Sequence, residues 1–148
     1  MARLRHLAIA TPDPEATASF YIDCFGLERL RDVSGVWGYG VILSDGHLNF
    51  AVLRFTTDAA AGVERGTDFA GLHHLGFEVD DVDSAAERVE VNGGRARHDI
   101  TEALGIPHDA PVKGEFKFEG PDGVVFDLSE PGVWQVAVAS AEGTDSAR

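Results

Sequence analysis

The feature that most constrains this chain is an internal repeat. The segment that starts at His6 (HLAIA) resembles the segment that starts at His74 (HLGFE), 68 residues further along. Each copy then continues to an Asp-Gly turn, at Asp45-Gly46 and at Asp122-Gly123. A chain with two copies of one unit is expected to fold as two similar modules that share a core.

Each copy has the pattern of a strand, a helix and further strands. Asp13 can cap a first helix that starts at Pro14, and Val82, Ala85 and Val89 share one face of a second helix. Apolar stretches on both sides of each Asp-Gly turn predict β-hairpins. We therefore predict an α+β fold of two βαβββ modules. The predicted parts are a first module at 3–68, a second module at 71–135 and a flexible C-terminal tail at 136–148.

The composition excludes several classes of protein. The net charge of −13 and the isoelectric point near 4.6 argue against binding to nucleic acid or to anionic membranes. The single cysteine, Cys24, cannot form an intramolecular disulfide or a cysteine-based zinc cluster. No stretch approaches the roughly 20 apolar residues of a membrane span, and the first residues do not resemble a signal peptide. We expect a cytoplasmic protein that acts on a small molecule.

Strand alternation brings three metal-binding side chains to one face. On the two equivalent first strands, His6 and His74 point away from the helices, among small residues. On the last strand Phe126 and Leu128 are expected in the core, so Asp127 points to the same side as the histidines. Two imidazoles and one carboxylate suit Fe(II), which we favour, with Zn, Mn or Ni as alternatives.

The first module offers a fourth candidate ligand. Apolar flanks match Asn49 to Asp127, whereas counting from the Asp-Gly turn gives Phe50. We adopt the flank match, because a slip of one residue would turn the apolar side chains of that strand outward.

At these residues the chain resembles the vicinal oxygen chelate superfamily. That superfamily contains glyoxalase I, extradiol ring-cleaving dioxygenases, methylmalonyl-CoA epimerase, and the bleomycin and fosfomycin resistance proteins. The resemblance covers about residues 3–134 and rests on RHLAIA from Arg5, LHHLGFEVDDVD from Leu72 and GPDGVVFDL from Gly120.

The resemblance implies a fold, a metal site and an assembly. The two modules would form one curved mixed sheet around a central metal cavity, with the helices on its outer face, and the chain would form a homodimer. The implied ligands are His6, His74, Asp127 and, at the fourth position, Asn49. Glyoxalase I and the epimerase carry Glu or Gln at that position, whereas extradiol dioxygenases use only His, His and Glu. With Asn49 set aside and Asp127 in place of that Glu, this chain is closer to the extradiol pattern.

Three functions stay open. The one we favour is an extradiol-type dioxygenase, whose metal chelates vicinal oxygens of a small catechol-like or hydroxy-keto substrate and binds dioxygen. The second is a metal-dependent lyase or isomerase, similar to glyoxalase or the epimerase, that acts through an enediolate. The third is a metal-free drug-binding protein similar to the bleomycin resistance group, which has no need of the His6, His74 and Asp127 set.

Several polar residues could supply a catalytic acid or base. The candidates are Glu115, His108, Tyr39, His98 and Glu78. Glu115 has the best argument from alternation, because it begins a strand and Lys117 shares its side. The connection at 99–113 is long for a loop and is expected to close over the metal as a lid.

Overall fold

The computed structural model describes residues 1–107 and 113–138, and within them the predicted order of elements occurs twice. The first module contains β1 (Arg3–Ala10), α1 (Pro14–Phe25), β2 (Glu28–Gly35), β3 (Gly38–Ser44) and β4 (Asn49–Phe55). The second contains β5 (Gly71–Glu78), α3 (Val82–Val91), β6 (Arg95–Ala96), β7 (Phe116–Glu119) and β8 (Val125–Ser129). Two short helices, α2 (Asp58–Ala61) and α4 (His98–Ala103), are additions to the repeat.

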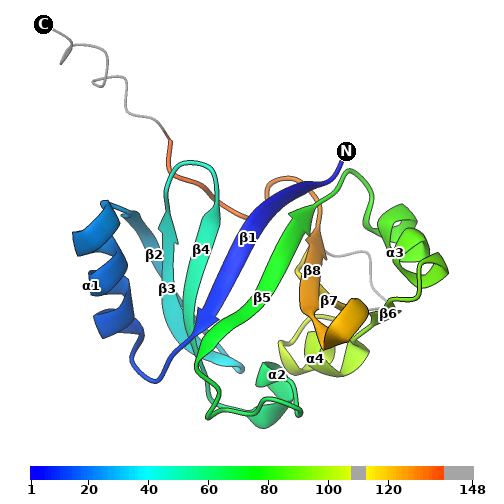
Figure 1. The fold of residues 1–148 in the computed structure, drawn as a ribbon, viewed down its shortest axis with the longest axis horizontal. Coiled ribbons are helices and arrows are strands. Elements are labelled where there is room, and N and C mark those ends of the chain that lie inside the picture. The colour runs from blue at the N-terminus through cyan, green and yellow to red at the C-terminus, as the bar shows by residue number, and fades with distance from the viewer. Residues whose placement is uncertain (108–112, 139–148) are drawn as a thin grey trace, which may run out of the picture.

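One mixed sheet joins the two modules. Its strand order is β2-β3-β4-β1-β5-β8-β7-β6, so the antiparallel pair of β1 and β5 lies at its centre. β1 pairs with β4 in parallel, and β5 pairs with β8 in the same way, which reflects the repeat. Figure 1 shows β1 and β5 side by side, with α1 and α3 towards opposite edges of the sheet. The predicted α+β class and mixed sheet are confirmed.

Local capping explains where the two long helices begin and end. The Asp13 side chain accepts from the N–H of Ala16, and Pro14 takes the first helical position of α1, where a missing N–H costs little. Gly26 ends α1 with a φ of 69°, which glycine adopts without strain. The Asp81 side chain caps α3 in the same way by accepting from the N–H of Ser84.

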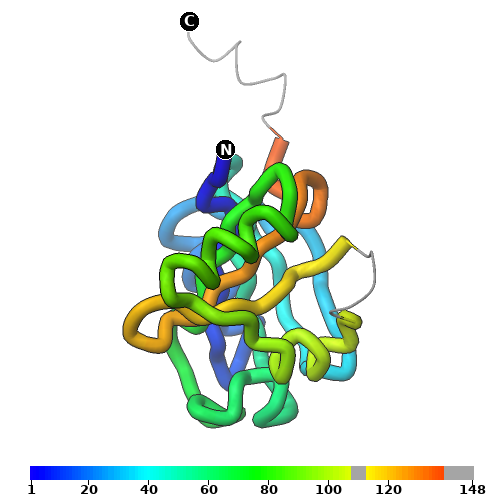
Figure 2. Tube along the Cα trace, turned by 90° about the vertical axis from the view of Figure 1, so that its right-hand side faces the viewer, coloured from blue at the N-terminus to red at the C-terminus, as the bar shows by residue number. Residues whose placement is uncertain are grey.

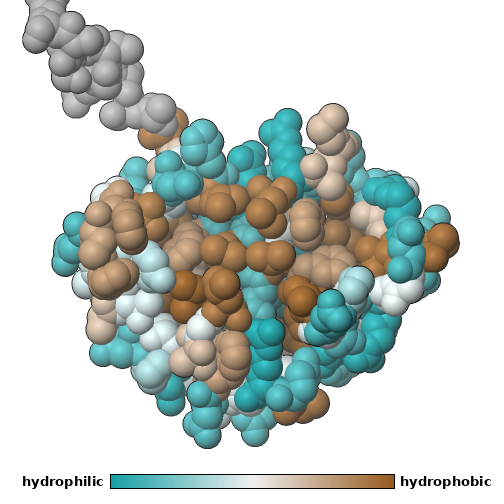
Figure 3. Space-filling model, in the orientation of Figure 1, coloured by the Kyte–Doolittle hydropathy of each residue, from teal (hydrophilic) through white to brown (hydrophobic). Residues whose placement is uncertain are grey.

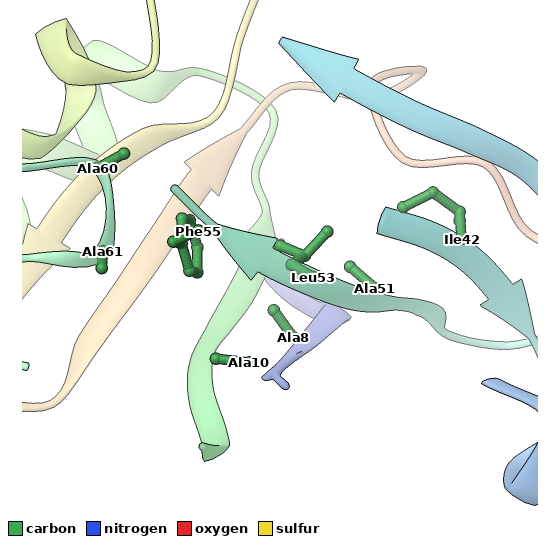
Figure 4. Packing of buried hydrophobic residues seen from close by; sticks show 8 residues of the cluster. All are labelled: Ala8, Ala10, Ile42, Ala51, Leu53, Phe55, Ala60 and Ala61. Atoms are coloured by element: carbon green, nitrogen blue, oxygen red, sulfur yellow. The ribbon is translucent and has the colours of Figure 1, made fainter. Parts of the chain in front are cut away.

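Three apolar clusters fill the two faces of the sheet. On one face Ala18 of α1 packs with Val41, Leu43 and Val52 of the first module. An equivalent cluster under α3 is formed by Val79, Ala85, Phe118 and Leu128. The third cluster, shown in Figure 4, lies on the opposite face and combines alanines with three larger side chains. Its members are Ala8, Ala10, Ile42, Ala51, Leu53, Phe55, Ala60 and Ala61. Because the alanines are small, they leave room in front of that face.

The segment predicted as a lid contains a helix. α4 begins at His98, and Ile100 and Thr101 on it are buried against β7. The preceding residue, Arg97, anchors the helix through ion pairs with Glu64 and Asp99. Figure 2 shows α3 and α4 on opposite sides of the second module. In the parts of the chain that the structure describes, no helix has the length and apolar character needed to cross a membrane.

Candidate metal centre and pocket

Three buried donors meet at the centre of the sheet, from His6 on β1, His74 on β5 and Asp127 on β8. One donor atom from each lies within 4.8 Å of the other two. His6 Nε2 is 3.2 Å from His74 Nε2, and Asp127 Oδ2 is 3.3 Å from His74 Nε2 and 3.9 Å from His6 Nε2. The structure therefore brings together the three residues that strand alternation assigned to one face.

A chain of hydrogen bonds fixes the tautomer of His74. The carbonyl oxygen of Ala61 can only accept, so His73 Nε2, 2.7 Å away, donates to it. Desolvation by burial lowers the pKa of His73 to about 3, so this ring is neutral and its Nδ1 accepts. His74 Nδ1, 2.8 Å from His73 Nδ1, must then be the donor. Desolvation also lowers the pKa of His74 to about 4, so His74 Nε2 carries no proton and its lone pair can act as an acceptor or a ligand.

Asn49 fixes the His6 ring in the same way as His73 fixes His74, through a hydrogen bond at Nδ1. Asn49 Nδ2 donates to the carbonyl oxygen of Gln135 at 2.8 Å, so Asn49 Oδ1 is the atom that accepts from His6 Nδ1, at 2.7 Å. With Nδ1 used in this way, His6 Nε2 faces His74 and Asp127. The indole of Trp134 stacks on the His6 ring, with centroids 5.0 Å apart and planes 3° from parallel, and holds its orientation.

Three electron-pair donors that converge in this way favour a bound cation. Two ring nitrogens face a fully buried carboxylate, and neither Asp127 oxygen has a hydrogen-bond partner among the described residues. A buried carboxylate without compensation costs several kcal/mol. Two imidazoles and a carboxylate are ligands of Zn, Fe, Mn and Ni, and partners such as Asn49 and His73 orient the rings as the outer shell of a metal site does. The donor set therefore fits a divalent metal ion.

Lys117 brings a second source of positive charge to the same place. It lies on β7 directly opposite Asp127 on β8 and is buried. Its Nζ is 2.6 Å from Asp127 Oδ1, as an ion pair without hydrogen-bond geometry, and 3.2 Å from His74 Nε2. Burial alone would raise the pKa of Asp127, but the positive charge of the Lys117 ammonium beside it helps to hold that pKa below its usual range. Asp127 is therefore an anion in the fold.

A cavity of about 240 Å³ opens in front of the centre. Its polar lining includes His6, His74, Lys117 and Glu115. The Glu115 carboxylate accepts a hydrogen bond from Trp134 Nε1 at 2.6 Å, which ties it to the residue that stacks on His6. The apolar lining comes from the first module and from the segment after α4, and includes Trp37, Leu53, Phe55, Leu104 and Ile106. Part of the predicted lid thus forms a wall of this pocket.

The other predicted site residues have different positions. Asn49 stands behind His6 with both ends of its amide engaged, rather than facing the three donors. Tyr39 is 47% exposed and shares its face of β3 with Val41 and Leu43, which pack under α1, so it does not reach the pocket. His108 lies outside the described residues.

The strand register identifies the first-module counterpart of Asp127. Asp127 lies opposite Gly76, two residues beyond His74, whereas Asn49 lies opposite His6 itself. The residue opposite Ala8, two beyond His6, is Ala51. The position that carries a carboxylate in the second module therefore carries a methyl group in the first.

Sequence reasoning did not assign roles to His73, Gly76, Lys117 and Trp134. Gly76 could have been found from the pattern, because a small residue two positions after His74 stands beside the site. A Cβ there would lie 2.6 Å from His6 Cβ and 2.8 Å from the Trp134 ring. Lys117 also had a signal, since alternation placed it on the side of Glu115.

A family model matches most of the chain. The model of the Glyoxalase/Bleomycin resistance protein/Dioxygenase superfamily matches residues 3–128. Among solved structures, a methylmalonyl-CoA epimerase in complex with methylmalonyl-CoA and NH4+ aligns with a TM-score of 0.66 and 24% identity, over 93% of this chain and 99% of that chain. A Streptomyces coelicolor methylmalonyl-CoA epimerase aligns with a TM-score of 0.65 and 24% identity, over 91% of this chain and 98% of that one. At this identity the structures show a shared fold.

Two curated relatives agree with this assignment. A probable chloroplastic lactoylglutathione lyase of Arabidopsis thaliana is 31% identical over 142 residues, which are 88% of this chain and 36% of that protein. The chain thus spans about a third of the plant relative. An ethylmalonyl-CoA/methylmalonyl-CoA epimerase of Cereibacter sphaeroides is 28% identical over 116 residues, which are 76% of this chain and 86% of that protein. The chain belongs to the Glyoxalase/Bleomycin resistance protein/Dioxygenase superfamily.

Proposed function

We propose that this protein is a metal-dependent lyase or isomerase that moves a proton at the carbon next to a carbonyl group. The observation that carries the proposal is that His6, His74 and Glu115 line one pocket, and that the two rings in it meet the carboxylate of Asp127. Such chemistry needs an electrophile at the carbonyl oxygen and an acid–base group nearby.

The named relatives favour this reaction over ring cleavage. One is named as a lactoylglutathione lyase and the other as an ethylmalonyl-CoA/methylmalonyl-CoA epimerase, and neither name describes an oxygenase. The dioxygenase reaction, which the ligand count alone favoured, therefore gives way to the second of the three sequence-based alternatives. Lactoylglutathione and methylmalonyl-CoA are both thioesters of a small acid with a second oxygen function, so we propose a substrate of that kind.

The pocket is suited to the acyl part of such a substrate. Its volume of about 240 Å³ lies below the roughly 300–1,000 Å³ of sites that enclose a drug-sized molecule. Trp37, Leu53 and Phe55 would exclude water from the acyl group. Arg31 also lines the pocket and offers a cation to a carboxylate or hydroxyl of the substrate.

Each polar residue has a separate role in this proposal. His6 Nε2, His74 Nε2 and Asp127 would hold the metal ion, with Asn49 and His73 orienting the two rings. The ion, when bound, supplies a Lewis acid that polarises the substrate carbonyl. Glu115 takes the proton from the adjacent carbon and returns it, and the hydrogen bond from Trp134 keeps the carboxylate in place.

Proton exchange in heavy water tests the reaction class. The protein, supplied with Zn, Mn, Ni or Fe(II) under nitrogen, is incubated in D2O with methylmalonyl-CoA or lactoylglutathione, and deuterium at the carbon next to the carbonyl is followed by NMR. We expect enzyme-dependent exchange with at least one of the two thioesters. Oxygen uptake with catechols and no exchange with either thioester would contradict the proposal and restore the dioxygenase.

We also infer a homodimer that covers the helix-bearing face of the sheet. Figure 3 shows hydrophobic residues spread across the middle of this face, between α1 and α3. Leu4 on β1, Leu72 on β5 and Phe20 on α1 are 49%, 64% and 56% exposed. An exposed apolar area of this kind is typical of an interface between subunits. Sedimentation velocity should give twice the chain mass, and a Leu72→Glu variant should shift towards the monomer; a monomeric wild type would contradict the inference.

A further inference from the structure

We propose that Lys117 is a built-in cation of this centre, and that its ammonium group and a divalent metal ion exclude one another from Asp127. Lys117 Nζ already lies 2.6 Å from Asp127 Oδ1, and the side chain is only 4% exposed. The inference concerns which cation occupies the centre, so it does not depend on the reaction proposed above.

The two cations would need the same electron pairs. His74 Nε2 carries one free lone pair, because its Nδ1 donates to His73 Nδ1. Lys117 Nζ approaches that nitrogen to 3.2 Å, and it forms an ion pair with Oδ1 of the same Asp127 carboxylate whose Oδ2 lies near the two rings. A divalent ion on these atoms would lie within a few ångströms of the ammonium, where repulsion between like charges is strong in a buried site. Only one of them can be bound at a time.

The first module shows that the scaffold itself does not require a lysine. By register, the counterpart of Asp127 is Ala51, and the residue opposite Ala51 on the neighbouring strand is Ile42. The equivalent pair in the second module is Lys117 and Asp127. The anion and the cation therefore occur together in one module and are both replaced by apolar residues in the other. This pattern indicates that Lys117 serves to balance Asp127.

The Lys117 side chain can move into the cavity when a metal ion binds. The backbone of Lys117 is fixed, since its N–H donates to Thr101 Oγ1 and its carbonyl accepts from the N–H of Arg97. Its side chain, in contrast, lines the cavity of about 240 Å³. Rotation of the flexible stem moves Nζ from the centre into the pocket, where it would face the substrate.

Removal of the ammonium should strengthen metal binding. The test compares Co(II) affinity, measured by calorimetry and by the visible absorption of bound Co(II), in wild type, Lys117→Met and Lys113→Met. Lys113 is the other lysine of the chain and is exposed, so it is the matched control. We expect Lys117→Met to bind Co(II) about tenfold more tightly or better, given the repulsion that is removed, and Lys113→Met to match wild type. Equal or weaker binding by folded Lys117→Met, or no binding by any of the three proteins, would overturn the proposal.

A measurement on the wild type covers the case in which Lys117→Met does not fold. Amines are labelled with an acylating reagent, and each lysine is read by peptide mass spectrometry with and without saturating Co(II). We expect Lys117 to be protected in the metal-free protein and labelled when Co(II) is bound, while Lys113 is labelled in both states. Continued protection of Lys117 with Co(II) bound would show that the two cations coexist. Neither readout requires turnover, so failure here is distinguishable from failure of the proposed reaction.

Discussion

Asn49 and His6 are direct partners across β4 and β1, and Asn49 Oδ1 accepts a hydrogen bond from His6 Nδ1 at 2.7 Å. This contact sets the face that the imidazole turns towards His74 and Asp127. Replacement of Asn49 by Leu should therefore lower metal affinity by about 10–100-fold, as loss of an outer-shell partner does. Calorimetric titration with Co(II) measures the effect.

The chain offers a matched control for this change. Asn92, the other asparagine, ends α3 on the surface, so Asn92→Leu should leave the metal affinity unchanged. Unaltered affinity in folded Asn49→Leu would show that the amide does not orient the His6 ring for metal binding.

Gly76, two residues after His74, permits the close approach of His6 and Trp134. At Gly76 an added Cβ would lie 2.6 Å from His6 Cβ and 2.8 Å from the Trp134 ring. Gly76→Ala should therefore lower the free energy of unfolding by about 1–3 kcal/mol, as overpacking does. Urea denaturation checks this value against Gly120→Ala, where the nearest atom, on Phe126, is 3.4 Å away. Equal stability of the two variants would contradict the tight packing of His6 and Trp134 against Gly76.

Burial of His73 and His74 predicts a loss of stability in acid. Desolvation lowers their pKa values to about 3 and about 4, from an ordinary value of 6.5. Because the unfolded chain takes up protons on these rings at a higher pH than the folded chain, their contribution to the free energy of unfolding is complete above pH 6.5. It is lost as the pH falls to about 4 for His74 and to about 3 for His73. Within its window, each ring should lower the free energy of unfolding by about 1.4 kcal/mol for each unit by which the pH falls.

Denaturation of metal-free protein at several pH values measures that slope. His73→Gln should reduce the dependence of the unfolding free energy on pH, whereas His47→Gln, at an exposed position, should not. The same slope in wild type and in His73→Gln would contradict a neutral, buried His73.

Sequence patterns predicted the parts of this fold that depend on local chemistry. The cap at Asp13 was visible because a side-chain acceptor and a following apolar stripe identify a helix start. The common face of His6, His74 and Asp127 followed from strand alternation. A cytoplasmic location stays a prediction from the sequence.

Features that depend on pairing between strands were less accessible. The hairpin of the first module closes at the pair Ser44 and Asn49, whereas that of the second closes at Glu119 and Val125. Flanking apolar residues could not reveal this difference, so Asn49 rather than Ala51 was matched to Asp127. α4 was missed for another reason: it is a six-residue helix stabilised by burial of Ile100 and Thr101 rather than by its own pattern.

Glu115 is the residue whose loss should affect turnover most selectively. Glu115→Gln keeps the shape of the side chain and removes the base, so the rate of proton exchange should fall by about 100-fold or more. Exchange in D2O measures the rate, and calorimetry with Co(II) should show an unchanged metal affinity. Glu87→Gln, on the exposed side of α3, is the control. Retained exchange in Glu115→Gln would assign the acid–base role to another group.

Anomalous X-ray diffraction from crystals grown with Zn or Mn tests the central claim most directly. The account predicts one anomalous peak per chain, bound by His6 Nε2, His74 Nε2 and an Asp127 oxygen at about 2.0–2.2 Å. A metal-saturated crystal with no peak between these three residues would contradict it.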